Sequence, residues 1–316
     1  NAIASLTESA EGATLYVTLE PCCHYGKTPP CTEAILEQKI ARVVIGSRDP
    51  NPLVSGKGAA ILRAAGVRVE EDFMREECDA LNPVFFHYIT KKTPYVVMKY
   101  AMTADGKIAA WTGDSKWITG ESARKKVQEL RHRYMGIMAG IGTVLADDPM
   151  LNVRIPGLKS PVRIICDSGL RIPMDSQSVK TAKEYRTIVA YAGEHSGEGC
   201  KEAEEKQEQL HAAGVKTVSV PDADGRVDLG KLMEYLGKQG IDSVLLEGGG
   251  TLNDAALSAG IVNEICAFIA PKIFGGAGAK TPVSGIGVAH PAEAVMLTLR
   301  QMETIGDDLM LRYSVD

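Results

Sequence analysis

The chain has 316 residues, of which 45% are hydrophobic and 24% are charged, and its formal net charge is −5 at pH 7. That length favours two domains, because one hydrophobic core rarely grows beyond about 250–300 residues. The negative net charge argues against a nucleic-acid partner. No apolar run approaches the roughly 18–20 residues of a membrane span. Because the first residues carry no secretory signal either, we expect a cytoplasmic protein.

The first part of the chain alternates between β-branched apolar runs and helical patterns. Strands are predicted over 13–19, 42–47 and 67–70, and helices over 32–39 and 59–65. This alternation indicates an α/β sheet with parallel strands. A polar stretch with a proline at 91–94 ends the pattern, so we place the domains at 1–92 and 93–316.

Beyond the boundary the same alternation starts again and predicts a second α/β domain. Strands are predicted over 95–101, 106–110, 136–139, 162–167, 187–192, 215–220 and 243–246. Helices are predicted over 121–133, 198–213, 228–237 and 252–259. The dense charge at 198–209 is typical of a solvated helix face.

Three of the seven cysteines, Cys22, Cys23 and Cys31, lie close together in the sequence. The number of cysteines is odd and the other four are scattered along the chain, which disfavours a disulfide framework and favours a reducing compartment. Cys22 and Cys31 each follow a proline, and zinc prefers thiolate and imidazole ligands. Their spacing of nine positions departs from the P-C-x-x-C of nucleobase deaminases. The residues alone therefore leave a zinc site and a pair of inert loop cysteines equally open.

Two glycine-rich turns are candidates for phosphate binding. EGGGT at 247–251 follows a predicted strand and precedes a predicted helix. Glycines at such a turn let backbone N–H groups approach a phosphate, whose charge a helix N-terminus favours. Because the string is not G-x-G-x-x-G, a plain tight turn is an equal alternative, and for GGAG at 275–278 the plain loop is favoured.

Taken in order, the motifs closely resemble the bifunctional deaminase–reductases of riboflavin biosynthesis. The strings that match in the first domain are LEPCCHYGKTPPC at 19–31 and DPNP at 49–52. Those in the second are KYAMTADGKIA at 99–109, GDSKWIT at 113–119, GTVLADDP at 142–149, LNVR at 151–154, DS at 167–168, EGGGT at 247–251 and APK at 270–272. The resemblance covers nearly the whole chain. It implies an incomplete cytidine-deaminase-like α/β/α domain followed by a dihydrofolate-reductase-like α/β domain.

For the first domain, the resemblance implies one zinc ion with Cys22 and Cys31 among its ligands, while Cys23 and His24 are loop residues. The family takes its third zinc ligand and its catalytic glutamate from a His-Ala-Glu motif just ahead of an Asn-Ala-Ile-like segment. This sequence opens with Asn1-Ala2-Ile3, so that motif is absent from it. We therefore expect a chain truncated within the deaminase domain, without turnover in that half. His24 is an alternative third ligand.

For the second domain, the resemblance implies NADPH as cofactor and a phosphoribosylaminopyrimidine as substrate. The implied cofactor contacts are Ala101, Ile108, Ala109, Ala110, Trp111, Trp117, Thr143, Asp147, Ser168, Gly249, Gly250, Thr251, Leu252, Asn253, Asp254 and Ala255. The implied substrate contacts are Ser115, Arg131, Leu151, Arg154 and Glu247, and the implied catalytic residues are Lys99, Asp147 and Glu247. Ser168 and Arg171 are candidate contacts for the 2′-phosphate of NADPH.

Each of these residues also has a purely structural alternative. Guanidinium groups suit a substrate phosphate, which favours that role for Arg131; the alternative is a surface charge on the basic helix predicted at 121–133. Trp117 could fill the core instead of a pocket. Lys99 and Glu247 are expected to point from two strand ends into one cleft, where they could polarise an imine or form an ordinary ion pair.

The resemblance implies NADPH-dependent reduction of 5-amino-6-(5-phosphoribosylamino)uracil to the ribitylamino form, by hydride transfer to C1′. In the complete protein, zinc-dependent deamination of the preceding diaminopyrimidine supplies that substrate, and the family implies a homo-oligomer. One alternative is a nucleic-acid base deaminase, which the acidic charge and only five phenylalanines disfavour. The other is a catalytically decayed scaffold, which the retention of every reductase string disfavours.

Overall fold

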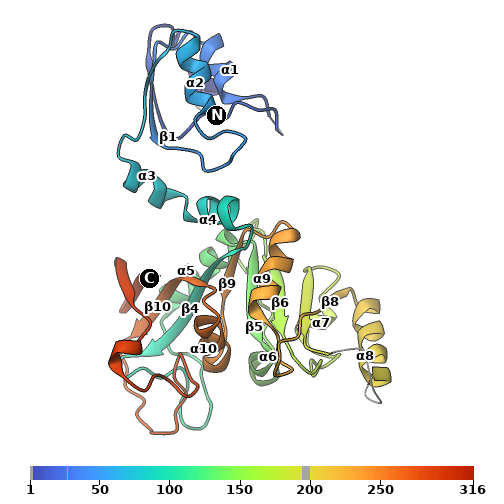
Figure 1. The fold of residues 1–316 in the computed structure, drawn as a ribbon. Helices are drawn as coiled ribbons and strands as arrows, with labels where there is room; N and C mark the ends of the chain where they lie inside the picture. Colours follow the sequence, from blue (N-terminus) through green and yellow to red (C-terminus); the bar gives the residue numbers. More distant parts are fainter. Residues whose placement is uncertain (1–2, 27, 194–199) are drawn as a thin grey trace. The chain divides into compact units, whose positions relative to one another are not determined.

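The computed structural model describes residues 3–26, 28–193 and 200–316. The chain divides into two compact units, Asn1–Lys92 and Thr93–Asp316, and each contains a sheet of its own (Figure 1). In the described residues, no helix combines the length and the apolar character that crossing a membrane requires.

The first unit is built on a parallel sheet in the order β1-β2-β3, with bounds Thr14–Leu19, Arg42–Ser47 and Arg68–Glu70. Helices α1 (Cys31–Glu37) and α2 (Lys57–Ala64) cover one face of it, because Ile35 and Leu62 pack with Val43 and Ile45 in one buried cluster. The side chains of β1 alternate between exposed and half-buried, as expected for a sheet covered on one face. The short turn η1 (Ile3–Ser5) precedes the sheet, and α3 (Arg75–Leu81) and α4 (Pro83–Lys91) follow it.

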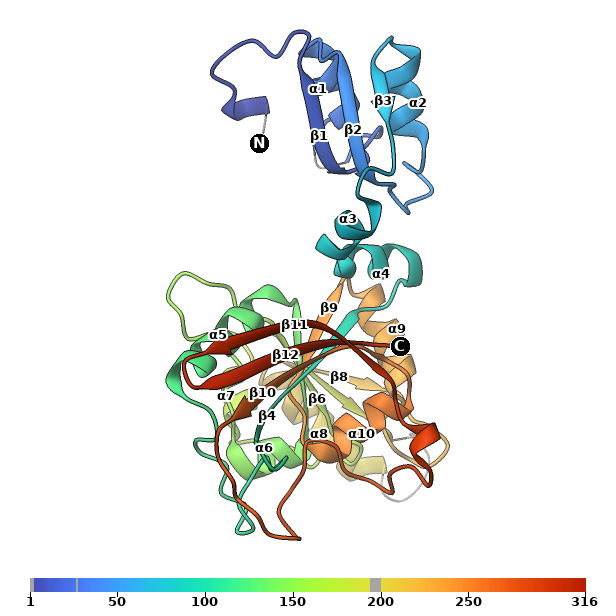
Figure 2. The same cartoon turned by 90° about the vertical axis from the view of Figure 1, so that its left-hand side faces the viewer.

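The second unit is built on a nine-stranded sheet in the order β11-β12-β10-β4-β9-β5-β6-β7-β8. From β10 to β8 all neighbouring strands are parallel, whereas β12 is antiparallel to both β10 and β11. Figure 2 shows the β11–β12 hairpin at one edge of this sheet. The strands are β4 (Tyr95–Thr103), β5 (Gly136–Gly140), β6 (Val162–Cys166), β7 (Thr187–Tyr191), β8 (Val215–Ser219), β9 (Ser243–Leu246), β10 (Val262–Ala270), β11 (Leu297–Ile305) and β12 (Asp308–Val315).

Helices cover both faces of the parallel part of this sheet. Leu232 and Leu236 of α9 (Leu229–Lys238) and Ala256 of α10 (Gly250–Ser258) belong to one core cluster. A second cluster joins alternate residues of the same strands to α6 (Ile141–Asp147), α7 (Gln177–Lys180) and α8 (Cys200–Ala212). Burial on both faces explains why these strands are continuous apolar runs. Helix α5 (Glu121–Arg133) and the turn η2 (Pro291–Glu293) complete the unit.

Most of the predicted elements are present, with bounds that differ by at most a few residues. The strand predicted at 106–110 is wrong. Gly106, at a φ of 76°, turns the chain, and Ile108 donates its backbone N–H to Lys280 instead of joining the sheet. The helix predicted at 198–213 corresponds to α8, and positions 198–199 lie outside the described residues.

Candidate functional site

A cavity of about 1070 Å³ lies in the second unit where several parallel strands end. Its lining includes Gly140 at the end of β5, Cys166 at the end of β6 and Gly249 just after β9. In open α/β sheets, ligands bind outside the carboxyl ends of the strands. The volume is at the upper limit of small-molecule sites, which occupy about 300–1,000 Å³. The position and size of the cavity therefore fit a large cofactor.

The turn between β9 and α10 forms one wall of the cavity. Gly249 precedes the helix, and a Cβ added to it would meet nothing closer than Thr143 Oγ1, at 3.9 Å. A Cβ on Gly250 would instead lie 2.7 Å from Ser284 Oγ and 2.8 Å from the Thr281 carbonyl oxygen. Gly250 is thus required by the close approach of the neighbouring loop, while Gly249 leaves open space on the cavity side.

The loop that follows β10 also lines the cavity, and Asp105 fastens it to the turn after β4. The Asp105 carboxylate accepts hydrogen bonds from Thr103 Oγ1 at 2.5 Å, from Gly275 N at 2.7 Å and from Phe274 N at 3.2 Å. The hydrogen bond from Thr103, with the backbone bonds, lowers the pKa of Asp105 to about 2. The carboxylate is therefore charged at physiological pH and holds this loop in place.

A charged cluster separate from the cavity lining is centred on Glu247, which directly follows β9. The Arg131 guanidinium donates to both carboxylate oxygens, Nε to Oε1 at 2.7 Å and Nη2 to Oε2 at 2.9 Å. Lys99 Nζ lies 3.8 Å from Oε2. Only 13% of the Arg131 side chain and 12% of the Glu247 side chain are exposed, so Arg131 is not a surface helix charge.

Three cations influence the single carboxylate of this cluster. Burial by itself would raise the pKa of Glu247, but the charges of Arg131, Lys99 and Arg154 lower it to about 2. The cluster consequently carries an excess of positive charge. That excess suits a ligand with an anionic group such as a phosphate.

The predicted site residues therefore separate into two groups. Those that line the cavity are Ile108, Ala109, Ser115, Thr143, Asp147, Ser168, Gly249, Gly250, Thr251, Leu252 and Ala255. Those that gather around the carboxylate are Lys99, Arg131, Arg154 and Glu247. The buried Leu151 adjoins Asn152, whose carbonyl oxygen accepts from Arg131 Nη1 at 3.1 Å. Asp147 belongs with the first group, away from the other two implied catalytic residues.

Six predicted cofactor contacts are not among the residues that line the cavity: Ala101, Ala110, Trp111, Trp117, Asn253 and Asp254. Asn253 is buried and donates its amide to the Pro282 carbonyl, so it supports the wall from behind. Trp117 does not fill the core, because 58% of it is exposed and the Arg124 guanidinium lies 4.6 Å from its ring. Both tryptophans are exposed in this structure.

Several residues line the cavity that the sequence did not point to, among them Asp222, Arg226 and Lys280. They lie on loops between elements and belong to none of the motifs, although Lys280 follows the GGAG string at 275–278 closely. Arg171, an expected 2′-phosphate contact, also lines the cavity beside Ser168.

In the first unit, the two expected zinc thiols are neighbours. Cys31 donates its backbone N–H to Cys22 Sγ at 3.3 Å, and Thr32 donates its own to the Cys22 carbonyl at 3.2 Å. Catalytic zinc sites use three protein ligands. Within the described part of the chain, no group of three histidine, cysteine or acidic residues could hold a metal, and His24 does not complete one. These residues supply two of the three protein ligands that a catalytic zinc requires, so the described residues do not fit a complete zinc site.

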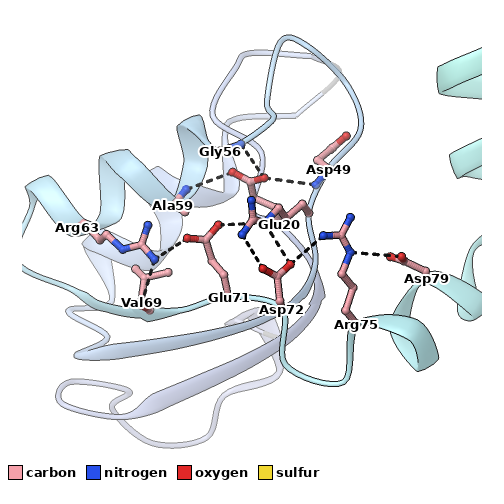
Figure 3. A network of polar contacts seen from close by, with 11 residues as sticks. Glu20, Asp49, Gly56, Ala59, Arg63, Val69, Glu71, Asp72, Arg75 and Asp79 are labelled. Atoms are coloured by element: carbon pink, nitrogen blue, oxygen red, sulfur yellow. Dashed lines mark hydrogen bonds and ion pairs between the residues drawn. The ribbon is translucent and has the colours of Figure 1, made fainter.

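The turn that carries Cys22 is anchored by Glu20, which sequence reasoning did not single out. Its buried carboxylate accepts backbone hydrogen bonds from Asp49 at 3.3 Å, Gly56 at 3.0 Å and Ala59 at 3.3 Å (Figure 3). These bonds connect the turn with the loop at 49–56 and with α2. Next to it, Arg48 forms ion pairs with Glu71 and Asp72.

Comparison with known proteins shows two family matches. The RibD C-terminal domain matches residues 94–311, and the cytidine and deoxycytidylate deaminase zinc-binding region matches residues 1–47. The riboflavin biosynthesis protein RibD of Actinobacillus pleuropneumoniae is 55% identical over 315 residues, covering 100% of this chain and 82% of that protein. RibD of Escherichia coli is 37% identical over 317 residues, covering 96% and 82%.

Solved structures agree with these relatives. The diaminohydroxyphosphoribosylaminopyrimidine deaminase/5-amino-6-(5-phosphoribosylamino)uracil reductase of Thermotoga maritima is 35% identical, with a TM-score of 0.82 over 98% of this chain and 81% of that chain. RibD of Acinetobacter baumannii is 33% identical, with a TM-score of 0.81 over 97% and 82%. The likeness confirms the predicted fold class.

Proposed function

The chain belongs to the RibD family of bifunctional riboflavin-biosynthesis enzymes, and we propose that its second unit reduces 5-amino-6-(5-phosphoribosylamino)uracil with NADPH. The observation that carries this proposal is the combination of a glycine-walled cavity of about 1070 Å³ with an adjacent cationic cluster around Glu247. The test is loss of NADPH absorbance in the presence of this substrate. Absence of oxidation by well-folded protein would contradict the proposal.

The residues that line the cavity are suited to binding NADPH. Gly249 leaves room for a phosphate to approach the backbone at the start of α10, where the helix dipole favours negative charge. Arg171 and Ser168 are our candidates for the 2′-phosphate, since both line the same cavity. When bound, the cofactor supplies the hydride, and the protein supplies position and electrostatics.

The contacts of the two arginines suggest different roles for them. Arg131 uses Nε and Nη2 on Glu247 and Nη1 on the Asn152 carbonyl, so each of its three nitrogens already has a partner in the protein and only two of its five N–H donors are left. Arg154 is exposed, and its guanidinium has no carboxylate within ion-pair distance among the described residues. We assign Arg154 to the substrate phosphate and Arg131 to the orientation of Glu247. Glu247 and Lys99 then face the sugar carbon that accepts the hydride.

Lys99 is assigned to proton transfer during ring opening of the sugar. Replacing it by Met is expected to lower kcat by about 10²–10⁴-fold, the usual contribution of a positioned acid or base. The KM for NADPH should stay unchanged, because Lys99 does not line the cavity. The matched variant Lys99→Arg keeps the positive charge next to Glu247, and comparison of the two separates charge from proton transfer. Undiminished turnover of Lys99→Met would remove Lys99 from the mechanism.

Two adjacent glycines provide a test of the cofactor cavity. Gly249→Ala is expected to fold normally, because its Cβ meets only Thr143 Oγ1 at 3.9 Å, yet to raise the Kd for NADPH roughly tenfold or more by occupying the phosphate approach. Gly250→Ala should also lose about 1–3 kcal/mol of stability from overpacking against the 281–284 loop. Fluorescence titration with NADPH and thermal unfolding measure the two effects. Unchanged NADPH affinity in Gly249→Ala would place the cofactor elsewhere.

For the first unit, we propose the family's zinc-dependent deamination of the diaminopyrimidine that precedes the reductase substrate. The support is the matched zinc-binding region and the adjacency of Cys22 and Cys31. The cytoplasmic location and the homo-oligomer expected from the resemblance stay predictions.

A further inference from the structure

The segment 150–154, which contains Leu151 and Arg154, belongs to no helix or strand. Leu151 is buried and adopts a φ of 48°, a left-handed conformation that side-chain-bearing residues rarely take. Such a conformation persists only where the surroundings over-determine it. The surroundings of this segment are side chains that capture its backbone groups.

The carbonyl before Leu151 is held by Arg163 of β6. Its side chain is fully buried and, among the described residues, forms no ion pair with a carboxylate. Nη1 donates to the Met150 carbonyl at 3.2 Å, and the other donors go to side chains and carbonyls of Ser178, Thr181, Tyr185 and Thr187. Burying a cation that has hydrogen bonds but no ion-pair partner costs folding free energy. Here it connects Met150 firmly to the sheet.

The residues after Leu151 are held from α5. Arg131 donates to the Asn152 carbonyl, and one turn earlier the Gln128 side-chain oxygen accepts from the Arg154 backbone N–H at 2.9 Å. Gln128 is only 8% exposed. Between them, Val153 donates its N–H to Ser160 Oγ at 3.1 Å. The backbone of Arg154 is therefore fixed to the same helix that carries the partner of Glu247.

We infer that Gln128 and Arg163 are positioning residues of the reductase, which hold segment 150–154 so that Arg154 meets the substrate phosphate beside Glu247. Neither residue lines the cavity or bonds to Glu247. Gln128 acts through the Arg154 backbone, and Arg163 acts through Met150 and the left-handed Leu151. The inference rests on the proposed function, from which Arg154 takes its role.

The test is a double-mutant cycle read by calorimetric binding of ribose 5-phosphate and by steady-state NADPH oxidation. Gln128→Met removes the acceptor at nearly constant volume. It is expected to raise the Kd for ribose 5-phosphate and the KM for the uracil substrate about 5- to 10-fold, which corresponds to the loss of one hydrogen bond. The KM for NADPH should stay unchanged. In an Arg154→Ala background the same change should add less than about twofold. Arg163→Lys keeps the positive charge but removes the branched guanidinium group, and it should also raise the Kd for ribose 5-phosphate.

A matched variant separates positioning from general destabilisation. His132→Leu removes a side-chain bond from the same helix to Lys159, outside the segment, and should leave the Kd unchanged. Equal effects of Gln128→Met with and without Arg154 would overturn the inference, as would failure of the unmodified chain to bind ribose 5-phosphate. Binding without NADPH oxidation would support the inference while contradicting the proposed reaction.

Discussion

Replacing Arg131 by Met is expected to reduce kcat/KM for NADPH oxidation by at least about 10³-fold and to lower the free energy of unfolding by about 3–5 kcal/mol. The reason for both losses is the carboxylate of Glu247. It would stay buried without the two short hydrogen bonds from Arg131, and its one remaining ion-pair partner would be Lys99, at 3.8 Å. The Asn152 carbonyl would lose its donor as well. Urea unfolding and steady-state kinetics measure the two losses.

A second substitution separates the structural effect from the chemical one. Arg131→Met/Glu247→Leu removes the buried carboxylate but leaves Lys99 buried without its carboxylate partner. Part of the stability should therefore return, since buried ion pairs replaced by apolar groups are often neutral. Activity should not return, because Glu247 is then missing. Recovery of activity in the double variant would show that the pair is only structural.

The pH dependence of stability provides another check on this pair. The pKa of Glu247 is lowered from 4.5 to about 2 in the folded protein, against the effect of burial, by Arg131 and then by Lys99. A lowered folded-state pKa contributes stability that is present above the unfolded value and lost as pH falls through the folded value. Between pH 4.5 and about 2 the unmodified chain should therefore lose more unfolding free energy than Arg131→Met.

The parallel strands were predictable because their burial on both faces leaves a continuous apolar signature. β6 and β9 illustrate this, since all four residues of β9 and the three central residues of β6 are buried. β10 was not predicted, although its residues 265–270 form a continuous apolar run after Asn263 and Glu264, so this strand could have been predicted from the sequence. In the structure, Asn263 accepts from Val96 N and Glu264 accepts from Arg312, and both partners are distant in sequence. The β11–β12 hairpin escaped prediction because the side chains of β11 are mostly exposed and show no regular alternation.

The candidate site, too, could be predicted only in part from the sequence. The motifs indicated which residues matter, but the pairing of Arg131 with Glu247 joins positions 116 apart and follows only from the fold. Arg163 could not have been predicted, because an arginine within a short apolar strand resembles an edge or surface residue. Its burial depends on hydroxyl and carbonyl groups that surrounding loops deliver. Residues that act through backbone contacts leave no motif in the sequence.

The largest expected effect on stability away from the site comes from Arg312 of β12. Its Nη2 lies 2.6 Å from Glu264 Oε1 of β10, with 17% and 11% of the two side chains exposed. Tyr95 OH donates to the other Glu264 oxygen at 3.4 Å, and Arg312 Nη2 donates to Tyr134 OH at 3.4 Å. Arg312→Met leaves the Glu264 carboxylate buried without its cation. We expect it to cost about 3–5 kcal/mol of unfolding free energy.

A pair on the surface provides the matched control for this prediction. Lys126 and Glu303 are 3.5 Å apart, but 32% and 37% of their side chains are exposed. Lys126→Met should therefore cost no more than about 1 kcal/mol, because water screens such pairs. Glu264→Met in the Arg312→Met background should restore most of the loss, since no unpaired charge is left. Equal costs for the buried and the exposed pair, measured by urea unfolding at pH 7, would show that the C-terminal hairpin is held by its strand pairing with β10 and not by this ion pair.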